Sequence, residues 1–407
     1  MHNGPLTGVR ILDLSRILAG PWAGQLLADY GADVLKIEQP GSGDETRRWG
    51  PPWLTDPENA QALDSAYYLS ANRNKRSMTC NLAHAEGQAL FAELAETADV
   101  VLENFRVGTM QRFGLDAATL RARNPRLIYC SVSAFGQTGP RAGEPGYDAM
   151  IQAVGGLMSV TGEAAEVGGR PQKVGVAVAD IMAGMYASTA ILAALNRRHE
   201  SGQGETIDVP LFDSQVAWLA NQAMNYLVGS AVPGRHGTGH PNLVPYQAFP
   251  TADGDIMIAV GSDRQFRDCM RALGLDEVAE DPRYRENAGR VEHRNALLAS
   301  ISDATRRHKT AALLSILGDA GVACGPINDL AGVFHDPYVE QAGLVTALER
   351  ADAGEVPTVL NPVRFEGSSK RAEFAPPALG EHTDEILREE LGYDEEKIAA
   401  LRADGAI

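Results

Sequence analysis

Short apolar runs alternate with longer amphipathic ones over the first two hundred residues. Four runs have the length and composition of buried strands, namely Val9–Leu14, Asp33–Ile37, Val100–Glu103 and Leu127–Val132. Between them, Trp22–Tyr30 and Ala83–Thr97 have helical spacing, and Gly31 ends the first of these helices. Strand, helix and strand at this spacing predict parallel βαβ units with right-handed crossovers. We therefore expect an α/β fold with a Rossmann-like sheet.

The pattern changes after residue 170. Asp180–Arg198 is apolar on all sides, which is typical of a buried helix, and Thr206–Leu211 has the pattern of another strand. Tyr246–Val260 predicts a β-hairpin, and the charged tail, Thr383–Ala403, predicts a pair of amphipathic helices. From these changes we expect a large domain from residues 1–200 and 331–407, a small domain over 225–330, and a linker over 201–224.

Charge and composition narrow the function. The chain has 36 Lys and Arg against 53 Asp and Glu, a formal net charge of −17. This balance argues against binding nucleic acid or an anionic membrane, but it leaves room for a local basic pocket that takes one phosphorylated ligand. No apolar stretch is expected to reach the ~18 residues of a membrane helix, because the best, around Ala177–Leu195, is broken by Asp180 and Gly184. The beginning of the chain resembles no targeting peptide, so a cytoplasmic location is expected.

Familiar catalytic motifs are missing from the sequence. It contains no G-x-G-x-x-G, no phosphate-binding loop, no G-x-S-x-G and no HExxH. The four cysteines form no CxxC pair, and His236 and His240 are separated by glycines, so no metal site is expected. Serine and cysteine nucleophiles lack a recognisable partner histidine. Carboxylates remain as the candidates.

Asp180 is the most informative carboxylate, because it opens the long apolar helix. An aspartate there can simply cap the helix. The same position can also hold a partly desolvated carboxylate rigidly beside backbone N–H groups. Such a carboxylate can attack an activated acyl group, and the N–H groups can stabilise the developing oxyanion.

Seven segments together resemble one protein family. They are LDLSRILAGPWAGQLLADYGADVLKIEQPGSGDETR, SANRNKRS, VLENFRVGTMQRFGL, NPRLIYCSVSAFGQTGP, GYDAMIQAVGGLMSVTG, VAVADIMAGMYA and LGEHTDEIL. In this order they resemble the class III (CaiB/BaiF-type) CoA-transferases, which include formyl-CoA transferase, over essentially the whole chain. Within the family, RRWGPP at 47–52, AYYLSANRNKRS and VPYQAF at 244–249 are most similar to the succinyl-CoA:glutarate CoA-transferases.

The resemblance implies a fold and a reaction. The fold is a Rossmann-like large domain with a smaller α+β domain, in a homodimer whose subunits interlock like linked rings. The substrates are an acyl-CoA and a small carboxylic acid, and no further cofactor is expected. Asp180 falls on the catalytic position. Its carboxylate forms a mixed anhydride with the donor acyl group and then an aspartyl-CoA thioester, which the acceptor carboxylate attacks.

The family motifs also imply the binding residues. Those that match the CoA-binding segments are Arg16, Ile17, Ala19, Ala71, Lys75, Arg76, Asn104, Phe105 and Arg112. Gln39 and Ser133 depart from formyl-CoA transferase, which has Arg and Lys there, so phosphate or adenine contacts are doubtful at these two positions. The glycine-rich stretch Gly234–Gly239 lies near where the family carries a mobile loop. An inter-domain linker is the alternative for this stretch.

We expect succinyl-CoA as donor and glutarate or a similar dicarboxylate as acceptor. The candidate pocket residues for the acceptor are Arg47, Arg48, Trp49, Tyr147, His240 and Tyr246, although a tryptophan can also be core and an arginine can also be surface. Two other functions stay open. An α-methylacyl-CoA racemase would need a histidine where Gly146-Tyr147-Asp148 has tyrosine, a poor base at neutral pH. A CoA-binding protein without turnover is the non-enzymatic alternative.

Overall fold

The computed structural model describes residues 4–366 and 373–407 and divides into two compact units. The first unit comprises Met1–Leu157, Val174–Met224 and Tyr338–Ile407, and the second comprises Met158–Lys173 and Asn225–Pro337. Residues 201–224, expected to be a linker, instead belong to the first unit. They contribute a strand of its main sheet, because TIDVP pairs in parallel with the strand IYCSVS.

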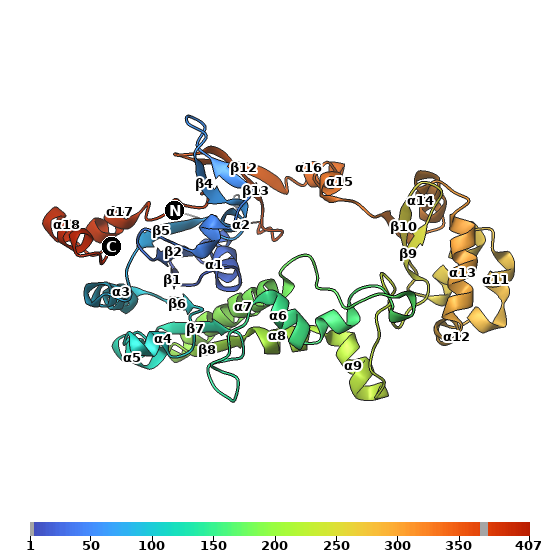
Figure 1. Cartoon of the computed structure of the whole chain (residues 1–407), viewed down its shortest axis with the longest axis horizontal. Coiled ribbons are helices and arrows are strands. Elements are labelled where there is room, and N and C mark those ends of the chain that lie inside the picture. Colours follow the sequence, from blue (N-terminus) through green and yellow to red (C-terminus); the bar gives the residue numbers. More distant parts are fainter. Residues whose placement is uncertain (1–3, 367–372) are drawn as a thin grey trace. The chain divides into compact units, whose positions relative to one another are not determined.

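The first unit is built on a six-stranded parallel sheet with the order β5-β2-β1-β6-β7-β8 (Figure 1). Its strands are β1 (Arg10–Asp13), β2 (Asp33–Glu38), β5 (Lys75–Thr79), β6 (Val100–Glu103), β7 (Ile128–Ser133) and β8 (Thr206–Pro210). The order reverses between β1 and β6, so the chain leaves β1 toward one edge of the sheet and returns to build the other. In sheets of this type, ligands bind outside the carboxyl ends of the strands at such a reversal. The α/β prediction is confirmed.

Each face of this sheet carries its own hydrophobic core, because successive side chains along a strand point to opposite faces. In β1, Leu12 packs with Leu35 in the first core, while Ile11 packs with Val34 in the second. The helices around the sheet are α1 (Ala19–Asp29), α3 (Ala85–Thr97), α4 (Thr109–Arg112), α5 (Ala117–Arg123), α6 (Asp148–Val154), α7 (Val178–Ser201), α8 (Leu211–Trp218), α17 (Thr383–Glu389) and α18 (Glu395–Ala403). Residues of α3, α5, α17 and α18 pack in the first core, and residues of α1, α6, α7 and α8 pack in the second.

Shorter elements complete the first unit. They are η1 (Glu45–Arg48), α2 (Ala66–Leu69), the hairpin of β3 (Trp53–Thr55) with β4 (Ala62–Ser65), and the hairpin of β12 (Val345–Arg350) with β13 (Gly354–Val359). Three elements, η2 (Leu157–Val160), α9 (Ala220–Gly229) and α16 (Pro337–Gln341), cross the boundary between the units.

Helix α7 is long and apolar enough to cross a membrane by length and composition alone, with 24 residues and a mean hydropathy of 1.6 over its most apolar window. The expectation that no stretch has this character is therefore wrong, because Asp180 and Gly184 lie inside the helix without ending it. Half of that window is buried, and Ala183, Ala187 and Ile191 pack in the second core. A Cβ on Gly184 would come within 2.6 Å of the Ala19 carbonyl oxygen, so glycine allows α1 and α7 to approach closely.

The second unit has a core of its own. It contains a three-stranded antiparallel sheet of β9 (Tyr246–Pro250), β10 (Asp255–Ala259) and β11 (Ala323–Pro326). Its helical segments are η3 (Ala165–Val167), α10 (Asp263–Ala272), α11 (Asp276–Glu280), η4 (Pro282–Tyr284), α12 (Asn287–Glu292), α13 (Arg294–Thr305), α14 (Thr310–Asp319) and α15 (Leu330–Phe334). Phe249, Phe266 and Leu297 lie at the centre of this core. The predicted hairpin at 246–260 is confirmed.

Candidate active site

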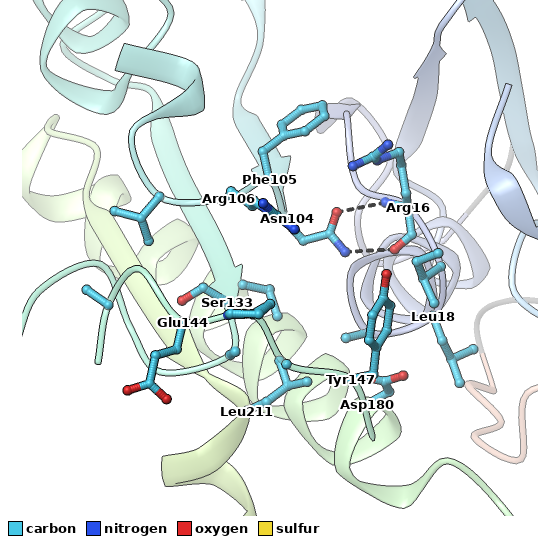
Figure 2. A pocket seen from close by; sticks show the side chains of 18 of the residues that line it. Arg16, Leu18, Asn104, Phe105, Arg106, Ser133, Glu144, Tyr147, Asp180 and Leu211 are labelled. Carbon is cyan, nitrogen blue, oxygen red and sulfur yellow. Dashed lines mark hydrogen bonds between the residues drawn. The ribbon is translucent and has the colours of Figure 1, made fainter. Parts of the chain in front are cut away.

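The carboxyl ends of β1 and β6 meet at the reversal of the strand order. The loop after β1 carries Arg16, and the loop after β6 carries Asn104. The Arg16 amide donates to Asn104 Oδ1 at 2.8 Å, and Asn104 Nδ2 donates to the Arg16 carbonyl at 2.7 Å. Figure 2 shows this reciprocal pair. It fixes the two loops to each other.

Ile17 has a left-handed backbone, with φ of 71°. This conformation is strained for a β-branched residue, so neighbouring contacts must maintain it. Its amide donates to Asp44 Oδ1 at 3.3 Å, and Asp44 Oδ2 in turn accepts from Lys36 Nζ at 2.9 Å. The side chains of Lys36 and Asp44 are fully buried, so this ion pair is a rigid support beneath the loop.

A cavity of about 190 Å³ opens above these loops. Its lining includes seven of the sequence-predicted residues, namely Arg16, Ile17, Ala19, Asn104, Phe105, Tyr147 and Asp180. Figure 2 shows Asp180 and Tyr147 approaching the space from the helical side, with Arg16, Asn104 and Phe105 across from them. Segments that are far apart in the sequence thus converge on one space, as expected for a binding site at the strand ends.

Asp180 is the third residue of α7, and Ala177 precedes the helix as its N-cap. The interpretation of Asp180 as the capping residue is therefore wrong. Its side chain is only 7% exposed. No hydrogen bond to its carboxylate is found among residues 4–366 and 373–407. Burial, reinforced by the negative charge of Asp148, raises the pKa of Asp180 to about 7.

Tyr67 lies in the surroundings of Asp180, and Trp49 packs against Tyr67. The rings of Trp49 and Tyr67 meet edge to face, with centroids 5.2 Å apart. Burial raises the pKa of Tyr67 to about 12, and the charges of Asp180 and Asp148 contribute to this shift. Tyr67 therefore lies within electrostatic reach of Asp180. Sequence reasoning missed Tyr67, although it belongs to the quoted AYYLSANRNKRS segment.

A second cavity, of about 270 Å³, shares Arg16, Glu45 and Phe105 with the first as lining residues. Arg16 pairs with Glu45 at 2.7 Å, and its guanidinium carbon lies 5.0 Å from the centre of the Phe105 ring. Gln39 lines this second cavity and Ser133 lines the first, so both doubtful positions are near the site. Arg48, a candidate for the acceptor pocket, also lines this second cavity, whereas the lining residues Glu45 and Arg106 were not expected from the sequence.

Other predicted binding residues lie elsewhere. Lys75 is fully buried, and its Nζ donates to Asp13, Asn72 and the Pro21 carbonyl, each at 2.9 Å. Burial lowers the pKa of Lys75 to about 8, against the opposing effect of Asp13. With its donors engaged inside the protein, Lys75 does not fit the expected role of a phosphate contact.

Arg76 and Arg47 are also committed to internal ion pairs. Arg76, in the first half of β5, pairs with Asp33 at the beginning of β2, so it lies toward the amino ends of the strands. Arg47 is buried and pairs with Glu38 at 2.7 Å and Asp64 at 2.8 Å. The expectations of a CoA contact at Arg76 and a substrate contact at Arg47 therefore do not fit the geometry.

Ala71 and Arg112 line neither of these two cavities. Ala71 is completely buried. The guanidinium carbon of Arg112 lies 5.2 Å from the centre of the Phe113 ring, and Phe113 itself lines the second cavity. The structure therefore brings neither side chain to the cavity surface.

His240 and Tyr246 belong to the second unit. Their ring centroids are 5.3 Å apart, and the His240 amide donates to the Tyr246 carbonyl at 2.9 Å. Burial and the charge of Arg294 lower the pKa of His240. The glycine-rich stretch lies in the same unit, where Arg235 donates to the carbonyls of Glu163 and Gly169, each at 3.0 Å. A part for these residues in the acyl pocket stays a prediction.

Comparison with known proteins agrees with this geometry. Residues 6–383 match CoA-transferase family III. The chain is 46% identical to succinate–glutarate CoA-transferase from Agrobacterium fabrum over 385 residues, 95% of each chain. It is 40% identical to succinyl-CoA:glutarate CoA-transferase from Homo sapiens over 403 residues, 99% of this chain and 90% of the human protein. A crystal structure of a CaiB/BaiF family protein from Brucella suis superposes with a TM-score of 0.83 at 44% identity, covering 95% of this chain and 99% of that one.

The family match spans nearly the whole chain, and the relatives share well over a third of its residues across almost their full length. The resemblance inferred from the seven sequence segments is thereby confirmed. The chain belongs to CoA-transferase family III and is an enzyme of that class.

Proposed function

We propose that this enzyme transfers CoA from succinyl-CoA to glutarate or a closely related dicarboxylate, with Asp180 as the covalent nucleophile. The names of the similar proteins support the substrates. One structural observation carries the assignment of Asp180. It is a buried carboxylate, without a hydrogen-bond partner among the described residues, in the same cavity as Arg16 and Asn104.

The first step forms an anhydride. One Asp180 oxygen attacks the thioester carbonyl carbon of the donor, the carbon–sulfur bond breaks, and CoA leaves as a thiolate that takes the electron pair. The raised pKa of Asp180 makes the ionised carboxylate a stronger nucleophile than an ordinary aspartate, and half of it is still ionised near pH 7. Its burial limits water, which would hydrolyse the anhydride.

The thiolate then attacks the Asp180 carbonyl carbon of the anhydride and releases the donor acid. The aspartyl-CoA thioester that results keeps the energy of the original bond. The acceptor carboxylate attacks this thioester, the carbon–sulfur bond breaks, and a second anhydride forms between Asp180 and the acceptor. The released thiolate then attacks the acceptor carbonyl carbon of that anhydride, which yields the new acyl-CoA and frees Asp180 as a carboxylate. The amides of Val178, Ala179 and Ile181 in the first turn of α7 already donate hydrogen bonds within the protein, so we do not assign the oxyanions to them.

Three arginines supply positive charge for the CoA phosphates. Arg16 and Arg106 line the first cavity, and Arg48 lines the second. Guanidinium groups bind phosphate through charge-assisted, bidentate hydrogen bonds. We assign the nucleotide portion of CoA to the second cavity and the pantetheine arm to the first, with Arg16 at their common wall. The lining of both cavities supports this orientation.

The acyl group requires a pocket near Asp180 that accepts its second carboxylate. Trp49, Tyr67 and Tyr147 are the candidates from the first unit. Tyr147 is 67% exposed, so its phenol is free to turn toward a ligand. His240 and Tyr246 of the second unit remain our proposed additional contacts.

We also propose that the enzyme is an interlocked homodimer and that it works in the cytoplasm. Helix α9 contains no buried residue and exposes Met224, Tyr226, Leu227 and Val228, an apolar face that a second copy would cover. Light scattering during gel filtration tests the assembly. A monomer of 43.4 kDa at micromolar concentration would contradict the dimer.

The decisive experiment combines a substrate panel with a trap. Purified enzyme is incubated with acyl-CoA donors against carboxylic acid acceptors, and products are measured by mass spectrometry. We expect the highest kcat/KM for succinyl-CoA with C4–C6 dicarboxylates. Hydroxylamine added during turnover should convert Asp180 to a hydroxamate.

Asp180→Ala should lose exchange by at least three orders of magnitude while still binding CoA. A matched control is Asp116→Asn, which alters an aspartate that caps α5, where Asp116 accepts from the amides of Ala118 and Thr119. The control should keep normal rates. Exchange that persists in Asp180→Ala, or a hydroxamate on another residue, would show that a different nucleophile acts.

A further inference from the structure

Asp148 is attached directly to the first turn of α7. Its Oδ1 accepts a hydrogen bond from the Ala179 amide at 2.8 Å. Ala179 is the residue before Asp180, and the helix has no cap of its own, because Ala177 at the N-cap has no side-chain acceptor. Asp148, from the beginning of α6, thus acts as a cap supplied by another helix.

The second oxygen of Asp148 is held as well. Gln152, one turn later in α6, donates from Nε2 to Asp148 Oδ2 at 2.8 Å. Gln152 Oε1 then accepts from the Val174 amide at 2.9 Å, just ahead of α7. Gln152 is fully buried. Both carboxylate oxygens of Asp148 are therefore fixed, and the segment that enters α7 is tied to the same pair of side chains.

The inference from these contacts depends on the proposed function of Asp180. It adds a role for Asp148, which takes no part in the reaction steps described above. We propose that Asp148 is a positioning residue that holds the first turn of α7 by its cap and, through its fixed negative charge, drives Asp180 toward its acylated state. Asp148 lines neither of the two cavities described above.

The negative charge on Asp180 is lost during the first step of the reaction. Before attack, Asp180 is an anion within electrostatic reach of a second, immobile anion. Attack forms the oxygen–acyl bond and breaks the carbon–sulfur bond, so the negative charge leaves on sulfur and the Asp180 acyl group is neutral. The repulsion between the two aspartates therefore disappears in the anhydride and stays absent in the aspartyl-CoA thioester. A charge at Asp148 favours both covalent intermediates over the free carboxylate.

Other charged or titratable groups surround Asp180, and none of them replaces Asp148. From the elements packed against the first turn of α7 and from the walls of its cavity these are Tyr67, Arg16, Glu45, Arg106, Glu144, Tyr147 and, at the beginning of α8, Asp213. Among the charges of the described residues, only that of Asp148 joins burial as a cause of the raised pKa of Asp180.

Variants that remove the charge of Asp148 but keep a hydrogen-bond acceptor for the Ala179 amide separate its electrostatic role from its capping role. Asp148→Asn and Asp148→Ser both retain an oxygen that can cap Ala179, and both are neutral. Gln152→Leu does the opposite, since it loosens the support but leaves the charge. Because a neighbouring like charge shifts a pKa by about 1 unit or more, the neutral variants should move the acid limb of kcat/KM about 1 pH unit lower. Their trapped aspartyl hydroxamate should fall about tenfold.

In the neutral variants we expect the rate to change in opposite directions at low and at high pH. At low pH a larger fraction of Asp180 is ionised in the neutral variants, whereas their plateau rate at high pH is lower because the nucleophile is weaker. Gln152→Leu should lower the rate without shifting the acid limb, and Asp148→Glu, which restores a negative charge, should return the limb toward its original position. Asp116→Asn is the matched cap control and should change neither.

Two results would overturn the proposal. One is an unshifted acid limb in both Asp148→Asn and Asp148→Ser, and the other is an equal shift in Gln152→Leu. The pKa of Asp180 is measured independently of turnover by carboxyl ¹³C NMR titration of the free enzyme, assigned with Asp180→Asn. A lowered Asp180 pKa in the neutral variants supports the coupling even if the substrates are not those proposed, so failure of the substrate proposal is distinguishable.

Discussion

The burial of Asp180 lowers the stability of the folded protein at neutral pH and raises the nucleophilicity of the Asp180 carboxylate. Burial removes the hydration that an ionised carboxylate needs, and no hydrogen bond from the described residues replaces it. The same lack of stabilisation makes the group a better nucleophile. The protein holds the charge in place because the rest of α7 is anchored in the second core.

Because the buried charge of Asp180 destabilises the folded protein, Asp180→Asn should increase its stability in a pH-dependent way. The folded pKa of about 7 lies above the value of 3.8 expected for an exposed aspartate, so protonation favours the folded state. The stability from this group is present below pH 4 and is lost as the pH rises through 7. Asp180→Asn should therefore raise the free energy of unfolding at pH 8 by up to about 4 kcal/mol. Urea titrations at pH 5 and pH 8 test this, and an equal gain at both values would contradict it.

Arg16 and Arg76 should respond differently to truncation, although both match CoA-binding motifs. Arg16→Ala should raise the KM for the acyl-CoA about tenfold, because it removes a cation from the wall that both cavities share. Arg76→Ala should leave that KM unchanged, because its guanidinium pairs with Asp33 and Glu390. Steady-state kinetics with varied acyl-CoA measure both. A raised KM in Arg76→Ala alone would reverse the assignment.

The predicted residues that line the cavity are mostly those whose motif follows a strand end. Arg16, Ile17, Asn104 and Phe105 come directly after β1 and β6, so their place in the fold follows from the sheet. Lys75 and Arg47 could not be placed from sequence, because an arginine or lysine gives no sign of whether it faces solvent or pairs with a buried carboxylate. Tyr67 was missed because its proximity to Asp180 arises only in three dimensions.

At the scale of elements, hydrophobic patterning located β1, β2, β6, β7 and β8 within one or two residues. It missed β5, whose sequence KRSMT has one strongly apolar residue. The inward side chains of β5 include Lys75 and Ser77, which are buried because partners satisfy them. Ser77 Oγ donates to Glu38 Oε2 at 2.7 Å. A strand that is buried through polar pairing gives no hydrophobic signal, so patterning could not have found it.

The ion pairs of η1 should matter for stability more than for catalysis. Arg47→Met removes the arginine partner of buried Glu38 and one of the two arginines that pair with buried Asp64, the other being Arg350, and breaking a buried pair in this way costs about 3–5 kcal/mol. We expect a lower free energy of unfolding in urea with little change in the KM of the enzyme that remains folded. A KM effect without loss of stability would instead return Arg47 to the substrate pocket.

At the scale of the whole molecule, each unit has a separate hydrophobic core. Leu297 lies in the core of the second unit, and Leu94 lies in the first core of the first unit. Sequence patterning predicted two domains, but it could not show that Met158–Lys173 joins the second unit, since that grouping depends on contacts distant in sequence.

Separate cores predict separate local responses. Leu297→Ala should accelerate amide hydrogen exchange mainly within residues 225–337, and Leu94→Ala should do so mainly around α3 and β6, each with a cost of about 2–5 kcal/mol. Exchange followed by mass spectrometry tests both variants. Uniform acceleration across both units in either variant would show that they unfold as one.

Under the proposed assignment, Arg16 and Phe105 lie between the cavity for the nucleotide of CoA and the cavity that contains Asp180. Substitutions around Trp49 and Tyr67 can then change the acceptor acid, while the affinity for the nucleotide portion of CoA is unchanged. Because the two cavities are lined by largely different residues, acceptor specificity can change through a few substitutions near Asp180. The residues that bind the nucleotide of CoA can stay the same.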